Sequence, residues 1–65
     1  MRREIKMWIA RDSDGMLCLF YYFKPQKGKD VWIGDVQPII LHQSMFPEIK
    51  WSDSEPTEVE IIIKK

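Results

Sequence analysis

An unbroken apolar run from Met16 to Phe23 constrains the fold of this chain more than any other feature of its sequence. The run is rich in aromatic side chains, which favour extended strands. A strand that is apolar on both faces belongs at the centre of a sheet that is covered on both sides, or at a contact with another molecule. We therefore expect residues 16–24 to form the central strand of a β domain.

The residues before this run predict a neighbouring strand and a tight connection to it. Residues 4–10 alternate, with Ile5, Met7 and Ile9 on one face, and a period of two is typical of a half-buried strand. The next residues are Asp12-Ser13-Asp14-Gly15. Asp side chains cap a turn and Gly accepts a positive φ, so this segment predicts the turn of a β-hairpin.

Shorter elements are predicted in the rest of the chain. Residues 25–30 are expected to form a polar loop, since Pro cannot extend a ladder and Gly interrupts any period. Residues 31–33 predict a third strand, and residues 39–42 a fourth strand or an apolar loop that enters the core. Residues 43–46 have room for one helical turn, and residues 57–63 predict a last strand. That strand carries Thr57, Val59, Ile61 and Ile63 on one face and Glu58 and Glu60 on the solvent face.

Length and cysteine content limit how such strands are stabilised. A chain of 65 residues has surface enough to bury only one core, so residues 1–65 are expected to form a single small β domain. Cys18 is the only cysteine, which excludes an internal disulfide. The predicted fold class is all-β: a small antiparallel meander or open barrel of four to five strands, with at most one short helical turn.

Charge and targeting signals bear on partners and location. Ten basic and ten acidic residues cancel, so no overall field attracts the chain to nucleic acid or to a membrane. Two arginines near the start are not followed by an apolar stretch of signal-peptide length. With a single thiol and no targeting segment, the expected location is the cytoplasm.

Asp12 and Asp14 raise the question of a calcium loop, because alternating carboxylates before a Gly imitate an EF-hand. Aligning them with that loop puts Ala10 and Tyr21 where the first and last ligands have to be carboxylates. The hairpin-turn interpretation is therefore favoured, and no metal or other cofactor is expected.

Candidates for catalysis are few. Cys18 and His42 are the only thiol and imidazole, and together they would make half of a metal site or a nucleophile with its base. Because Cys18 stands between two leucines, a buried structural thiol is favoured, and His42 is expected to be a surface or capping residue. The acidic residues of the C-terminal third are expected to be solvated rather than paired for acid–base catalysis, so no catalytic residue is predicted. They are Glu48, Asp53, Glu55, Glu58 and Glu60.

Aromatic residues next to basic ones are the main binding signal. On a small β-barrel such a surface stacks the bases of single-stranded nucleic acid, which is one hypothesis for this chain. The other is an interface with a second copy or another protein, because a strand that is apolar on both faces leaves a patch that so small a domain cannot cover. The neutral charge favours the protein interface. The predicted interaction surface consists of Trp8, Tyr21, Tyr22, Trp32 and Trp51.

Two segments carry a family resemblance: Ala10-Arg11-Asp12-Ser13-Asp14-Gly15 and Phe46-Pro47-Glu48-Ile49-Lys50-Trp51. With them the chain resembles a group of short uncharacterised proteins of gut bacteria, often encoded near phage or mobile-element genes, and the resemblance covers most of its length. It implies a phage or mobile-element setting and carries over no catalytic or binding residue. The leading expectation is a non-enzymatic interaction module.

Overall fold

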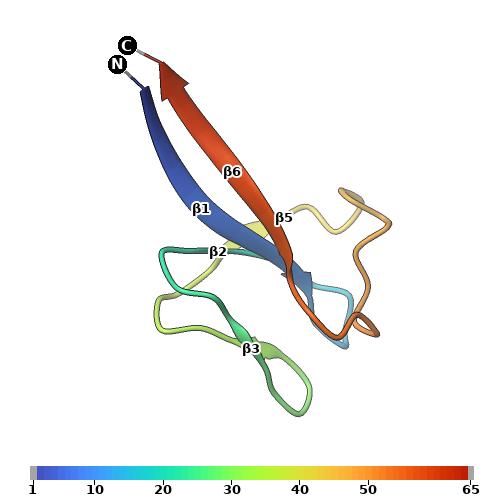
Figure 1. Ribbon diagram of the computed structural model, residues 1–65. Coiled ribbons are helices and arrows are strands. Elements are labelled where there is room, and N and C mark those ends of the chain that lie inside the picture. Colours follow the sequence, from blue (N-terminus) through green and yellow to red (C-terminus); the bar gives the residue numbers. More distant parts are fainter. Residues whose placement is uncertain (1, 65) are drawn as a thin grey trace.

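A computed structural model describes the backbone of residues 2–64 and the side chains of residues 5–60. The fold is all-β, as predicted, with six strands: β1 (Arg2–Arg11), β2 (Leu17–Tyr21), β3 (Gln26–Lys27), β4 (Trp32–Ile33), β5 (Ile39–Leu41) and β6 (Thr57–Lys64). Four of them form an open antiparallel sheet of order β5-β2-β1-β6, and β3 and β4 form a separate two-stranded ribbon. The C-terminal strand β6 pairs with the N-terminal strand β1 (Figure 1).

The predicted hairpin of the first two strands is confirmed. β1 pairs antiparallel with β2 in a register that places Ala10 opposite Cys18 and Met7 opposite Tyr21. The turn is closed by the N–H of Gly15, which donates to the carbonyl of Asp12 at 2.9 Å. Gly15 has a φ of 95°, a conformation that a side chain with a Cβ rarely adopts.

β2 lies between β5 and β1, so its predicted central position is also confirmed. Its predicted end at residue 24 is wrong, because the strand stops at Tyr21. Tyr22 takes a φ of 71°, and the N–H of Phe23 turns back to donate to the carbonyl of Tyr21 at 2.9 Å. The chain therefore leaves the ladder although its side chains remain apolar.

The loop predicted over residues 25–30 is wrong in part, since it contains β3. Gln26 pairs with Ile33 and Lys27 with Trp32 in a short antiparallel ribbon. Pro25 precedes the first of these residues and is fully buried. Its ring fills the core instead of interrupting a ladder, which is why the proline is compatible with a strand beside it.

The other predicted strands are present, with β4 inside the predicted strand at residues 31–33, but residues 43–46 form no helical turn. β5 and β6 correspond to the fourth and last predicted strands, and Glu58 and Glu60 are exposed, as expected. The predicted facing of Ile61 and Ile63 lies outside the described side chains. Residues 42–49 form isolated turns, such as the one closed by the N–H of Met45 and the carbonyl of His42 at 3.0 Å. In the described part of the chain, no helix has the length and apolar character needed to cross a membrane.

Each face of the sheet carries its own hydrophobic cluster, because alternate residues of β1 and β2 point to opposite faces. The ribbon of β3 and β4 covers the face of Phe20, and Gly34 follows β4 there. A Cβ on Gly34 would lie 2.8 Å from a ring carbon of Phe20, so only glycine allows this close approach. One cluster contains Ala10, Cys18, Phe20 and Trp32, with Trp8 and Trp51 packed against it. The other contains Ile9, Leu17 and Ile49, with Leu19, Leu41 and Val59 packed against it.

Candidate functional site

The Asp12–Gly15 segment is a structural turn. Asp14 caps it, because its Oδ1 accepts a hydrogen bond from the N–H of Met16 at 3.0 Å. Asp12 is only 7% exposed, and its Oδ1 accepts from the N–H of Trp32 at 2.9 Å. Its carboxylate therefore ties the hairpin turn to β4. Within the described side chains, no three His, Cys, Asp or Glu residues lie close enough together to hold a metal ion.

Cys18 is a buried thiol, as predicted. Its Sγ donates to the other carboxylate oxygen of Asp12 at 3.7 Å. Burial, followed by the negative charges of Asp12 and Asp14, raises the pKa of Cys18 to about 11. The thiol is therefore protonated at neutral pH and is a poor nucleophile. His42 is exposed, as predicted, and its Nδ1 lies 2.7 Å from the Oγ of Ser44.

The five carboxylates of the C-terminal third are spread over different elements. Among the described side chains, none of the five is hydrogen-bonded to another. Glu48 and Glu60 are exposed, and the other three have partners of their own. These are Lys24 for Glu55 at 2.7 Å, Lys6 for Glu58 at 3.7 Å and the N–H of Lys50 for Asp53 at 3.1 Å.

The aromatic residues of the predicted interaction surface differ widely in exposure. Trp32 is only 6% exposed, and its indole N–H donates to the carbonyl of Arg11 at 3.1 Å. Trp8 and Trp51 are half-buried against the same cluster. Tyr21 is half-buried, while Tyr22 is 69% exposed and meets it edge to face at 5.3 Å. The structure thus brings the three tryptophans together around one cluster, in which only Trp32 is buried.

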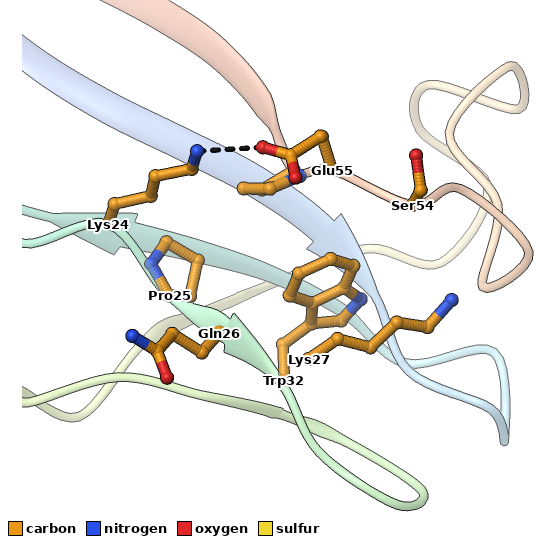
Figure 2. A pocket seen from close by; sticks show the side chains of 8 residues that line it. Lys24, Pro25, Gln26, Lys27, Trp32, Ser54 and Glu55 are labelled. Atoms are coloured by element: carbon orange, nitrogen blue, oxygen red, sulfur yellow. Dashed lines mark hydrogen bonds and ion pairs between the residues drawn. The ribbon is translucent and has the colours of Figure 1, made fainter.

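A small cavity of about 270 Å³ lies beside Trp32, between β3 and the segment before β6 (Figure 2). Lys24 crosses it to pair with Glu55. The Nζ of Lys27 donates to the carbonyls of Trp51 at 2.5 Å and Asp53 at 2.9 Å, and lies 4.3 Å from the Trp51 ring centroid. Both lysines therefore connect one segment to another, Lys24 through an ion pair and Lys27 through hydrogen bonds to carbonyls.

The opposite face of the sheet carries an apolar groove of about 290 Å³. Residues of four strands form its floor and the turn at Met45 forms one wall, so the groove combines segments far apart in the sequence. Apart from Glu60 at its border, every lining residue is apolar. The groove is lined by Met7, Ile9, Leu19, Leu41, Met45, Phe46, Val59 and Glu60.

The wall of this groove is held in place by the side chain of Arg11. Its guanidinium donates to five backbone carbonyls, three of them in the wall. The planar group donates to all of these carbonyls simultaneously because its five N–H donors point outward in a fixed geometry. The acceptors are Ile49 at 2.7 Å, Gly15 at 2.9 Å, Gln43 and Met45 at 3.0 Å, and Phe46 at 3.2 Å.

Sequence reasoning missed the groove although it found half of its floor. The alternation of Met7 and Ile9 predicted an apolar face. The wall could not be predicted in the same way, because Met45 and Phe46 lie in turns, where apolar residues follow no regular spacing. The role of Arg11 in the wall was missed, since nothing in the sequence marks a cation that is satisfied by backbone carbonyls.

Compared with protein families, with curated proteins and with solved structures, the chain matches none of them.

Proposed function

We propose that this protein is a non-enzymatic, cytoplasmic interaction module that binds an apolar segment of a partner protein in the groove beside Met45. The observation that carries the proposal is the groove itself. It is lined almost entirely by apolar side chains, and Met45 and Phe46 at its wall are 43% and 37% exposed. Exposed apolar surface of this kind marks protein-binding sites, and methionine is enriched in their cores.

Charge favours a protein segment over nucleic acid as the occupant. The cation that contacts the wall, Arg11, already donates to five carbonyls. Glu60 borders the groove and would repel phosphate. Nucleic-acid affinity depends on basic groups free to meet the backbone, whereas an uncharged peptide with Leu, Ile or Met side chains matches the apolar lining.

Single-stranded nucleic acid is the rival ligand, on the predicted aromatic surface. Its support is the exposed ring of Tyr22, near Lys24 in the sequence. Trp32 is unavailable for stacking because it is buried. Tryptophan fluorescence titrated with oligonucleotides at two salt concentrations separates the hypotheses: quenching that disappears at high salt would favour nucleic acid, and no quenching at low salt would exclude it.

The groove is tested with peptides selected from a random display library. We expect the selected peptides to be apolar and to shift the NMR methyl signals of Met7, Leu19 and Val59. Met45→Asp should lower their affinity about tenfold or more, because it buries a charge in the contact. The matched control is Val31→Asp, since Val31 is 44% exposed against 43% for Met45 but lies outside the groove.

Two outcomes would contradict the proposal. One is a set of peptides that shifts signals elsewhere and leaves the groove methyls unchanged. The other is an equal loss of affinity in Met45→Asp and Val31→Asp, which would indicate a general effect of added charge. The setting that the sequence resemblance implies, a phage or mobile element, is part of the proposal and is tested by identifying a partner encoded nearby.

A further inference from the structure

The turn that begins the wall of the groove is held partly by the ring of His42. The N–H of Met45 closes this turn by donating to the carbonyl of His42 at 3.0 Å. The backbone N–H of Ser44 donates to Nδ1 of His42 at 3.2 Å, and the Oγ of Ser44 lies 2.7 Å from the same nitrogen. The imidazole therefore accepts from the backbone two residues ahead, as Asn and Asp side chains do in Asx turns.

Only the neutral imidazole can accept the hydrogen bond from the backbone of Ser44. A neutral ring has one nitrogen that accepts and one that donates, so this bond requires that Nδ1 is the acceptor and that Nε2 carries the hydrogen. Protonation turns Nδ1 into a donor. The ring can then still donate to the hydroxyl of Ser44, but the backbone N–H of Ser44 faces another N–H and loses its acceptor.

Charged side chains from two other elements surround His42. From the hairpin turn, Asp14 lines the same cavity of about 500 Å³ as His42, so its carboxylate offers a protonated ring an alternative partner. From β1, the guanidinium of Arg11 donates to the carbonyl of the neighbouring Gln43 at 3.0 Å and repels a second cation there. Within residues 36–47, His42 is the only ionisable side chain. Both charges therefore favour movement of a protonated ring out of the turn.

We infer that His42 makes binding in the groove depend on pH: the neutral ring keeps the turn in the shape that binds an apolar segment, and protonation releases it. Imidazole is the side chain that changes charge between pH 5 and 8, and His42 is the only histidine of the chain. Met45, at the end of the turn, lines the groove. The effect on affinity rests on the proposed function, whereas the contact between His42 and Ser44 does not.

The affinity of one selected apolar peptide, with blocked ends and no ionisable side chain, is measured at pH 8 and pH 5.5. We expect it to fall about threefold at the lower pH, since one hydrogen bond of modest net strength is lost. His42→Asn keeps an acceptor for the N–H of Ser44 and does not titrate, so its affinity should be the same at both pH values. His42→Ala lacks the acceptor and should bind at both values as weakly as the original protein at pH 5.5.

NMR of the protein without peptide tests the turn directly. The amide signal of Ser44 should titrate together with the imidazole signals of His42. Amide exchange at residues 43–46, corrected for the intrinsic effect of pH, should be faster at pH 5.5 than at pH 8. In His42→Asn, neither the signal nor the corrected exchange should change with pH.

The outcomes separate this inference from the proposed function. A Ser44 signal that ignores the titration of His42 would overturn the inference, and so would a fall in affinity that persists in His42→Asn. A groove that binds peptides equally well at both pH values would also overturn it, because the turn would not control the groove. Absence of any peptide binding would instead contradict the proposed function, and the Ser44 signal would still show whether acid releases the turn.

Discussion

The two faces of the four-stranded sheet are covered to different extents. On the face of Phe20, the ribbon of β3 and β4 closes the buried cluster of Phe20 and Trp32, and Trp32 is held there through both its backbone and its indole. On the face of Leu19, a wall without regular secondary structure covers only one end of the floor and leaves the groove open. The first face therefore buries Trp32 of the ribbon, whereas Met45 and Phe46 in the wall of the second face remain exposed.

Truncating neighbouring residues of β2 should give the largest contrast between the faces. Phe20→Ala should cost about 3–5 kcal/mol of unfolding free energy, because it leaves a large cavity in the closed cluster. Leu19→Ala should cost about 1–2 kcal/mol, since Leu19 is only half-buried on the open face. Urea unfolding followed by tryptophan fluorescence measures both values. Equal losses would mean that the groove is packed as tightly as the closed face.

Removing the Arg11 side chain should show how the open face keeps its shape. Arg11→Ala is expected to cost about 1.5–3 kcal/mol, because charged hydrogen bonds to several carbonyls are lost. Amide exchange should accelerate selectively at residues 43–49, which the guanidinium holds, and peptide binding in the groove should weaken. Arg11→Lys is the matched control: it keeps the charge without the planar fork and should recover only part of the loss. Unchanged exchange in the wall would contradict this role.

The thiol in the closed face predicts a dependence of stability on pH. The folded pKa of Cys18, about 11, lies above the unfolded value of 9.0. The protonated thiol therefore contributes fully to the unfolding free energy below pH 9. This contribution is lost as the pH rises toward 11, because the unfolded chain releases the proton first. Unfolding free energy should fall over this range, and Cys18→Ala should reduce the slope. The same slope in both proteins would show that other groups cause the fall.

The smallest effect is expected for the exposed ion pair that spans the cavity beside Trp32. Lys24→Ala or Glu55→Ala should change the unfolding free energy by less than about 1 kcal/mol, since both side chains are more than half exposed and solvent screens their attraction. A double-mutant cycle of the two residues measures the pair directly. A coupling energy well above about 1 kcal/mol would show that the Lys24–Glu55 pair stabilises the fold more than an exposed ion pair is expected to.

Strands were predictable from the sequence where they carry a regular pattern of apolar residues, and they were missed where they do not. Where alternation or an apolar run spans several residues, as in β1, β2 and β6, the strand was predicted and its start or end missed by a few positions. β3 was missed because two polar residues after a proline carry no periodicity. The end of β2 was missed because Tyr22 adopts a positive φ, which a tyrosine in the sequence does not predict.

The candidate site was predictable only in its floor. Met7 and Ile9 belong to a face that the period of two identified, but the wall depends on contacts between residues more than thirty positions apart, such as Arg11 and Met45. The predicted aromatic surface was defined by residue type, and the structure distributes those residues between the core and the solvent according to their partners. Trp32 lies in the core, packed with Phe20, and its backbone N–H donates a hydrogen bond to Asp12.

The sequence by itself determined that this chain is a small β domain with a hairpin at Gly15 and a central apolar strand, because strand periodicity and turn chemistry are local properties. Tertiary structure alone decided the return of β6 to β1, the burial of Trp32 and the opening of the groove. These depend on which distant segments meet, and that choice follows from the total burial and hydrogen bonding of the whole chain rather than from any short stretch of it.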